Sequence, residues 1–199
     1  MKKTVLALAA LGLLAGQAMA QESPWLVRAR VVNIDTANKS SGLIGGDNAI
    51  RVSDKTIPEL DISYFFTPNI AAELILTYPQ KHTVRHRDAG RLGTFKHLPP
   101  TLSLQYHFTP KSTFSPYVGA GVNYTRISSV KLGGGADLEN DSFGLALQAG
   151  FDYKLDKNWS INFDVKKVQI RSDVTAGGAT VAKVKVDPLL IGVGIGYRF

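Results

Sequence analysis

Apolar side chains occupy every second position in eight separate segments of this sequence, and this repeat limits what the chain can fold into. Residues 70–78 show it clearly, with Ile70, Leu74 and Leu76 on one parity and Glu73 on the other. A period of two is that of a β-strand with one apolar face, whereas a helix repeats every 3.6 residues. The segments are residues 25–34, 57–66, 70–78, 97–108, 117–127, 142–153, 159–170 and 191–199. The pattern therefore predicts an all-β fold.

The connections between these segments alternate between short and long. Those at residues 67–69, 109–116 and 154–158 are short, and those at 35–56, 79–96, 128–141 and 171–186 are long and rich in Gly, Ser, Asp or Lys. This alternation, with an even strand number, is typical of bacterial outer-membrane barrels, and the chain is too short for a porin of about sixteen strands. We predict an eight-stranded antiparallel transmembrane β-barrel with short periplasmic turns and four long extracellular loops.

A soluble barrel of the lipocalin type is the alternative, because it would turn the apolar parity inward and the charged parity to water. Two features favour the membrane barrel. The charged parity carries groups of both signs that could pair inside a lumen, and aromatic residues of the apolar parity gather near strand ends, where membrane interfaces need them. These aromatic residues are Tyr64, Phe66, Tyr78, Tyr106, Phe108, Tyr153, Trp159, Tyr197 and Phe199.

The first twenty residues have the three zones of a secretory signal peptide. Lys2 and Lys3 precede an apolar run that ends at Gly16, and small residues surround Ala20. The run is shorter than the ~20 residues that a bilayer helix needs, so we predict cleavage rather than an anchor. Residues 1–20 are then a cleaved signal peptide, and residues 21–199 form a single barrel domain in the outer membrane of a Gram-negative bacterium.

Composition excludes several other classes of protein. The formal net charge is +7, but the basic residues are scattered rather than clustered on one face, so we expect no nucleic-acid partner. The chain has no cysteine, which excludes disulfides, thiolate metal sites and a thiol nucleophile.

Three separated blocks carry a resemblance to a known family. They are residues 97–102 (HLPPTL), residues 116–125 (PYVGAGVNYT) and residues 187–199, which begin with Asp-Pro and end with Tyr-Arg-Phe. Together they resemble the OmpW family of small outer-membrane proteins, which includes the AlkL-type proteins of hydrocarbon uptake, over the whole of residues 21–199. The resemblance implies a barrel that admits small hydrophobic molecules through the lipopolysaccharide layer.

The resemblance also implies partners. These are outer-membrane lipid, lipopolysaccharide and small hydrophobic molecules, together with the barrel-assembly machinery and periplasmic chaperones during biogenesis. Tyr197 and Phe199 at the end of the chain resemble the signal that the assembly machinery reads.

The parity opposite the apolar one would line the lumen, and toward the short turns it is polar. An eight-stranded interior is only just wide enough for side chains to fill, so charges there must pair and hydrogen-bond. We expect a polar plug rather than an open pore. Its predicted members are Arg28, Arg30, Asp61, Gln105, Gln148, Asp152, Asn162, Asp164 and Arg198.

Toward the long loops the same parity becomes apolar, as the lining of a small-molecule site usually is. The predicted apolar mouth comprises Val32, Ile34, Ile75, Ile127, Val168, Ile170 and Leu190, joined by Val184 and Val186 if the last strand begins early. The alternative is that these residues merely pack against folded loops.

A ligand that entered this mouth would meet the plug and would need a sideways exit. Pro99 and Pro100 offer one, since proline gives no ladder N–H and two in a row should interrupt pairing with a neighbouring strand. The hypothesis is uptake through the apolar mouth with lateral release into the membrane at Pro99 and Pro100. A simple bulge at a strand end is the alternative.

Other functions are a narrow ion-conducting pore, a non-transporting structural or receptor barrel and, less favoured, a lipid-modifying enzyme. The enzyme would use His97 or His107 with Ser103, but all three share the lumen parity, away from lipid. We therefore expect no catalysis and no cofactor. His82 and His86 lie in a basic loop without a helical pattern, so we expect no metal there. That loop could bind lipopolysaccharide phosphates through Lys81, Arg85, His86, Arg87 and Arg91.

Overall fold

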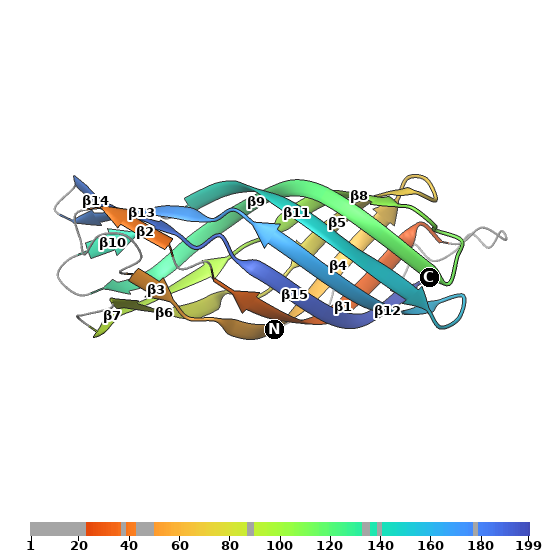
Figure 1. Cartoon of the computed structure of the whole chain (residues 1–199), viewed down its shortest axis with the longest axis horizontal. Coiled ribbons are helices and arrows are strands. Elements are labelled where there is room, and N and C mark those ends of the chain that lie inside the picture. The colour runs from red at the N-terminus through yellow and green to blue at the C-terminus, as the bar shows by residue number, and fades with distance from the viewer. Residues whose placement is uncertain are drawn as a thin grey trace, which may run out of the picture.

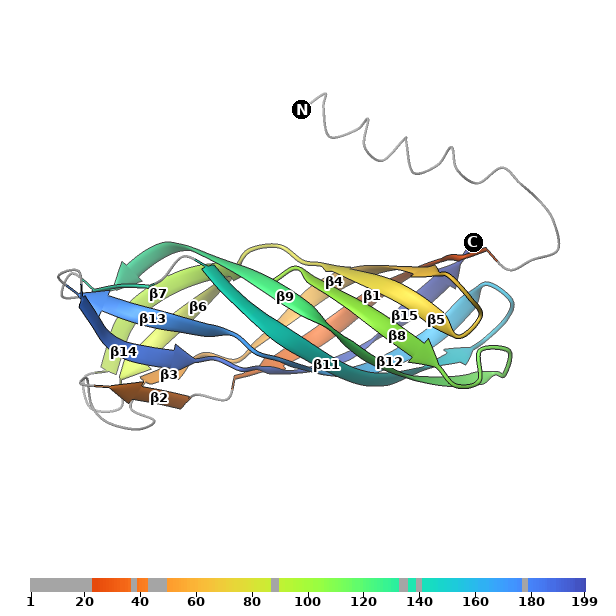
Figure 2. The same cartoon turned by 90° about the horizontal axis from the view of Figure 1, so that it is seen from above.

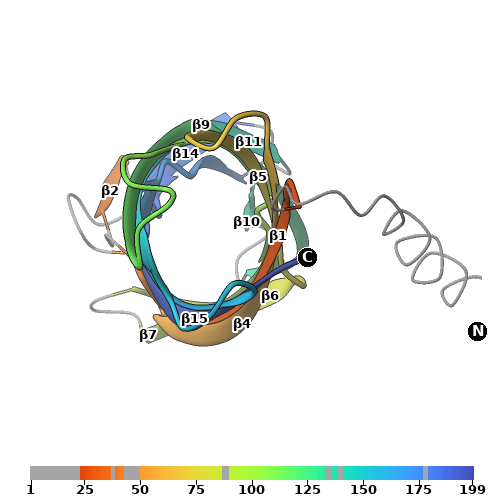
Figure 3. The same cartoon turned by 90° about the vertical axis from the view of Figure 1, so that its right-hand side faces the viewer.

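Eight long antiparallel strands close into a barrel in the computed structural model, which confirms the predicted architecture (Figures 1 and 3). The structure describes residues 23–36, 39–42, 50–86, 90–132, 136–138, 141–176 and 179–199, so the predicted signal peptide lies outside the described residues. In order around the ring the strands are β1 (Trp25–Asp35), β4 (Lys55–Phe65), β5 (Ile70–Leu76), β8 (Thr101–His107), β9 (Phe114–Leu132), β11 (Asp141–Lys154), β12 (Trp159–Val168) and β15 (Leu189–Arg198). Pairing of β15 with β1 joins the last strand to the first.

The apolar parity faces outward along the barrel strands, as predicted. In β1, Trp25 and Val31 are exposed while Arg28 and Arg30 are buried. The exposed large residues include Leu102, Leu145, Val193 and others on all eight barrel strands, and such an outer surface suits lipid rather than water. Within the described residues, the structure contains no helix that is long and apolar enough to cross a membrane.

The chain reverses at one end of the barrel through short turns, and this end is called the short-turn end below. It lies at the right of Figures 1 and 2, near the C-terminus. In the turn before β12, the Asp156 carboxylate accepts hydrogen bonds from the backbone N–H groups of Trp159 (2.7 Å) and Asn158 (2.8 Å). These two bonds lower the pKa of Asp156. The side chain of Asp156 therefore stabilises the turn that leads into β12.

The opposite, long-loop end is more regular than the sequence indicated. The four long connections contain the strands β2 (Lys39–Gly42), β3 (Ile50–Val52), β6 (Gln80–His86), β7 (Gly90–Leu98), β10 (Ala136–Leu138), β13 (Arg171–Ala176) and β14 (Ala179–Lys185). They extend the barrel wall to the left in Figure 2. The segments were predicted as loops because both of their faces carry polar residues, so apolar alternation is absent there.

Two strand predictions need correction. The segment 97–108 is not one strand, because it splits at Pro99 and Pro100 into the end of β7 and the whole of β8. The last strand does not begin early: β15 starts at Leu189, and β14, which holds Val184, is a separate strand in the four-stranded sheet of β10, β13, β14 and β2.

Candidate functional site

A network of buried charges crosses the lumen in the half nearer the short turns. Arg28 donates two hydrogen bonds to Asp152, from Nε at 3.0 Å and from Nη2 at 2.7 Å, and a third from Nη1 to Asp61 at 3.2 Å. Arg30 forms hydrogen-bonded ion pairs with Asp61 and, at 2.9 Å, with Glu73. Both arginine side chains are fully buried. This set is named the ion network, and its members are Arg28, Arg30, Glu59, Asp61, Glu73, Asp152, Asp164 and Lys166.

Neutral side chains complete the ion network. The Tyr117 hydroxyl donates to Asp164 at 2.9 Å, and the Asn162 amide donates to the Tyr117 oxygen at 3.1 Å and to Asp152 at 2.9 Å. Gln148 donates to Glu73 at 2.9 Å. Removing such charges from water is costly unless they are paired and hydrogen-bonded, and here strands from opposite sides of the ring provide the partners.

The structure brings together most of the residues predicted for the plug. Each of seven predicted residues contacts at least one member of the ion network, and these are Arg28, Arg30, Asp61, Gln148, Asp152, Asn162 and Asp164. Gln105 is buried nearby and accepts from His107, at 3.2 Å. Arg198 instead lies at the rim of the short-turn end, where its Nε donates to the Ser23 carbonyl and its guanidinium sits 4.2 Å from the Phe65 ring centre.

Sequence reasoning missed Glu59, Glu73 and Lys166 as members of the ion network, and Tyr117 as a neutral side chain that completes it. The available signal was their parity: each shares the lumen side of its strand with residues that were predicted. A single glutamate between apolar neighbours, such as Glu73, looks the same in sequence whether or not an arginine faces it across the lumen.

A cluster of buried apolar side chains occupies the lumen nearer the long-loop end. It is named the upper apolar cluster and comprises Val52, Val84, Phe95, Ile127, Ala146, Val168, Ile170 and Val186, with Leu92, Val130 and Leu190 packed against it. A second group of Val32, Ile34 and Ile57 also packs against Leu190. The lumen thus changes from charged to apolar along the barrel axis.

Most residues predicted for the apolar mouth lie on this side of the lumen: Val32, Ile34, Ile127, Val168, Ile170 and Val186 are buried in the two apolar groups, and Leu190 is partly buried against both. Ile75 is buried too, but it belongs to neither group and lies opposite Asp61 of the ion network in the pairing of β4 with β5. The side chain of Val184 lies outside the described residues. Val52, Val84 and Phe95 were missed because they come from segments that were predicted as loops.

The barrel wall is interrupted where the pairing of β4 with β5 gives way to that of β3 with β6. Pairing of β4 with β5 ends at Leu60 and Leu76, and pairing of β3 with β6 begins only at Val52 and Val84. The register is the same on both sides of the interruption, and the Ser53 N–H already donates to the Thr83 carbonyl at 3.2 Å. Between these points, residues 54–59 and 77–82 form no ladder with each other. This interruption is named the wall break.

Pro99 and Pro100 lie on the other side of the same segment. Toward β9 the register is continuous, and the Pro100 carbonyl accepts from the Tyr124 N–H at 3.1 Å. On the opposite edge, the pairing of β8 with β5 stops where Thr101 faces Ile75. The pairing of β7 with β6 resumes where His97 faces Gln80, and its register is shifted by one residue. The segment 77–79 is therefore unpaired on both edges. Pro58 and Pro79 also border the wall break, and a proline cannot supply a ladder N–H.

The side chains considered for catalysis are buried on the lumen side. His97, Ser103 and His107 are each at most 4% exposed. His107 contacts Gln105, and the Ser103 hydroxyl has no hydrogen-bond partner among the described residues. A serine nucleophile needs a base within hydrogen-bond reach, and Ser103 has none in this arrangement.

The histidines of the predicted basic loop differ in position. His82 is not on a solvated loop: it lies in β6, fully buried, with its ring stacked on that of His97 at 4.7 Å. His86 is half-buried at the end of the same strand, and within the described residues no three His, Asp or Glu side chains form a metal-binding group. Lys81, Arg85 and Arg91 are exposed, and Arg87 lies outside the described residues.

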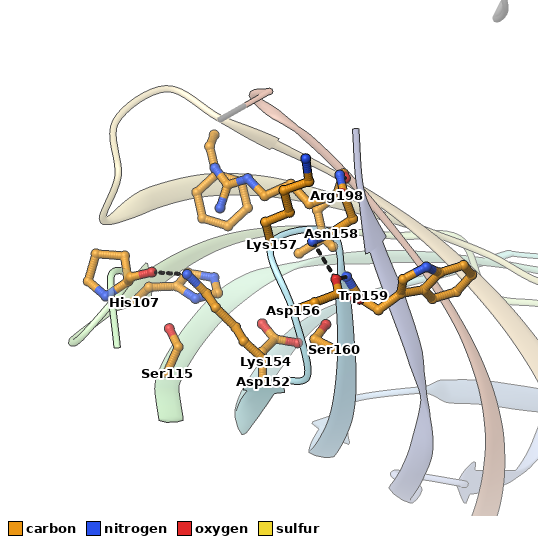
Figure 4. Close-up of a pocket in the computed structure, with 13 residues that line it drawn as sticks. His107, Ser115, Asp152, Lys154, Asp156, Lys157, Asn158, Trp159, Ser160 and Arg198 are labelled. Atoms are coloured by element: carbon orange, nitrogen blue, oxygen red, sulfur yellow. Dashed lines mark hydrogen bonds between the residues drawn. The ribbon is translucent and has the colours of Figure 1, made fainter. Parts of the chain in front are cut away.

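A small cavity of about 30 Å³ opens at the short-turn end (Figure 4). Its lining includes His107, Asp152, Lys154 and Arg198, and the Lys154 ammonium donates to the Pro110 carbonyl at 2.6 Å. Such a space holds a water molecule or two, whereas sites for small organic ligands usually span several hundred Å³. This cavity therefore suits water at the base of the ion network.

Residues 21–199 match the model of the OmpW family. An uncharacterized outer-membrane protein, y4mB, of Sinorhizobium fredii is 46% identical over 89% of this chain and 80% of its own length. The crystal structure of the outer membrane protein OprG from Pseudomonas aeruginosa is similar with a TM-score of 0.77 at 31% identity, covering 90% of this chain and 97% of that one. The solid-state NMR structure of the outer membrane protein AlkL in lipid bilayers is similar with a TM-score of 0.72 at 28% identity, covering 93% and 94%.

Proposed function

Because this chain belongs to the OmpW family of outer-membrane β-barrel proteins, we propose that it admits small hydrophobic molecules from outside the cell and releases them sideways into the outer membrane. The upper apolar cluster and the second apolar group are the proposed binding region. Their lining is apolar with few polar groups, which is the usual composition of a small-molecule site.

The ion network supports lateral release rather than passage along the axis. An apolar molecule that moved toward the short turns would have to separate Arg28 from Asp152 and Arg30 from Glu73 in a buried setting. Breaking buried ion pairs is strongly unfavourable. The same network argues against a narrow ion-conducting pore.

The wall break is the observation that carries the proposal. It lies beside the buried apolar residues Ile57 and Ile75, at the level where the lumen changes from apolar to charged. The segments 54–59 and 77–82 can separate there without breaking ladder hydrogen bonds, because none joins them. Pro99 and Pro100 form the far edge of this exit and Pro58 the near edge.

A reversible cross-link across the wall break tests the exit. If the ladder continued, Pro58 would face Tyr78, so the variant Pro58→Cys with Tyr78→Cys places a thiol on each side in a chain that has no cysteine of its own. The matched control is Ile62→Cys with Leu74→Cys, whose positions are already paired in the same sheet. Uptake of an apolar fluorescent probe is measured in vesicles with a lipopolysaccharide outer leaflet.

We expect the cross-link at positions 58 and 78 to remove most of the probe uptake, reduction to restore it, and the control cross-link to leave it unchanged. Full uptake through a fully cross-linked wall break would refute lateral release at this place.

A non-transporting structural barrel is the second candidate, and one observation favours it. The long connections extend the barrel wall as strands instead of remaining irregular. In that case the upper apolar cluster would serve only to hold this extension together, and the native protein would transfer no more probe than protein-free vesicles.

A further inference from the structure

Three buried polar atoms without hydrogen-bond partners lie along one edge of the wall break. They are Thr77 Oγ1, Gln80 Oε1 and His82 Nε2. Gln80 and His82 have no exposed surface, and both point to the lumen from β6. A buried polar group without a partner is costly and calls for a specific explanation.

The hydrogen bonds that these side chains do form fix the character of the unpaired atoms. His82 Nδ1 lies 2.8 Å from the Ser53 carbonyl oxygen, which can only accept, so Nδ1 carries the proton. Burial lowers the pKa of His82, so the ring is neutral and its Nε2 holds a lone pair. The Gln80 amide nitrogen donates to the Tyr78 carbonyl at 2.9 Å, which leaves Oε1 as the unpaired atom. Both unpaired atoms of β6 are therefore acceptors.

The surroundings of this acceptor pair are apolar and aromatic. The His82 ring stacks against His97 and lies 5.9 Å from the Phe95 ring, and Phe95 and Val84 belong to the upper apolar cluster. Gln80 lies opposite His97 in the pairing of β6 with β7. A molecule between the upper apolar cluster and the wall break would meet these acceptors on its way out.

We propose that Gln80 and His82 select apolar molecules that carry a hydrogen-bond donor, such as an aromatic alcohol, over molecules of the same size without one. A hydroxyl group would pair with either acceptor, whereas a hydrocarbon or an ether would leave both unpaired. The acceptor lone pairs would also repel a carboxylate. This inference rests on the proposed function, since it concerns a ligand on the lateral route.

The test compares two probes that differ in one group. 1-Naphthol has a donor, and 1-methoxynaphthalene has the same ring system and no donor. Their transfer into vesicles with a lipopolysaccharide outer leaflet is measured for the native protein, with protein-free vesicles subtracted. We expect 1-naphthol to enter about tenfold faster, as the difference of one buried hydrogen bond implies.

Variants locate the preference. Gln80→Leu with His82→Phe removes both acceptors, and we expect the two probes then to enter at equal rates. Gln80→Leu alone keeps the His82 and His97 stack and is expected to lose part of the preference. Thr83→Val, at the position directly after His82 and on the opposite face of β6, is the matched control and is expected to keep it. Folding is checked by the mobility shift of the unheated barrel on gels.

The outcomes separate the two proposals. Equal entry of both probes through the native protein would overturn the selection and leave lateral uptake standing. A preference that persists in the double variant would also overturn the assignment to Gln80 and His82. If neither probe enters above the protein-free level, the proposed function fails and this inference fails with it.

Discussion

The lumen accommodates Arg28 and Arg30 because the neighbouring strand presents glycine to them. In the pairing of β1 with β15, Arg28 lies opposite Gly196 and Arg30 opposite Gly194. A Cβ at Gly194 would lie 2.7 Å from the Cγ of Arg30, closer than real Cβ contacts allow. The absence of side chains at Gly194 and Gly196 thus provides the room in which two guanidinium groups reach carboxylates across a narrow barrel.

Arg28→Met tests the ion network at the scale of one residue. Methionine keeps much of the side-chain length but leaves Asp152 without its arginine and Asp61 with Arg30 alone, and breaking a buried pair in this way costs about 3–5 kcal/mol. We expect a loss of that size in unfolding by urea in lipid, together with a rise in ion conductance in planar bilayers. Lys111→Met, at an exposed turn, should change neither quantity. Unaltered stability of the Arg28 variant would contradict the role given to the network.

The β6 and β7 hairpin is the element whose structure the sequence concealed. Its lumen face carries Gln80, His82 and Val84, and its other face carries Lys81 and Arg85, so neither face is uniformly apolar. Alternation predicted the membrane-spanning strands because lipid on one side demands it, and it gave no signal where both faces are polar. The hairpin forms because β9 is long enough to pair first with β8 and then, toward the long-loop end, with β7.

This hairpin should loosen as the pH falls. Burial, followed by the nearby His82 and Lys55, lowers the pKa of His97 to about 3, whereas in an open hairpin it would titrate near the ordinary value of 6.5. Between these two values the open form binds more protons, so the free energy of opening is unaffected above pH 6.5 and decreases as the pH falls below it. Amide hydrogen exchange in β6 and β7, corrected for intrinsic rates, should accelerate from pH 6.5 downward. His97→Gln should weaken this dependence, and an identical dependence in the variant would rule out His97 as its source.

At the scale of the whole molecule, closure of the ring depends on the two ends of the chain. β15 pairs with β1 over ten register positions, from Leu189 to Arg198, and the Phe199 N–H donates to the Trp25 carbonyl at 3.3 Å. The Tyr197 ring contacts both Trp159 and Phe199 on the outer surface. Tyr197 and Phe199 remain the proposed assembly signal, and they lie at the C-terminal end of β15.

Deletion of Phe199 separates assembly from stability. The residue is 56% exposed and contributes little buried surface, so the purified variant should refold in detergent with nearly native stability. In cells, by contrast, we expect most of the variant to fail to reach the outer membrane, measured as the fraction with the gel mobility of the folded barrel. Leu155→Ala, at an exposed turn residue, is the matched control. Normal assembly of the shortened chain would contradict the proposed signal.

The sequence by itself determined the all-β class, the eight alternating segments and the change of the lumen parity from polar to apolar, and it favoured the outward direction of the apolar parity. These follow from local rules, since each strand has to present apolar side chains to lipid and polar or small ones to a narrow interior. The two prolines at 99 and 100 also predicted one interruption of pairing, but only the tertiary structure decided which charges pair, that residues 54–59 and 77–82 form no ladder and which acceptors stay unpaired. The ion pair of Glu73 with Arg30 joins residues that are far apart in the sequence. The missing ladder between residues 54–59 and 77–82 likewise depends on how distant segments are placed. Register around a closed ring sets such contacts, and no single strand encodes it.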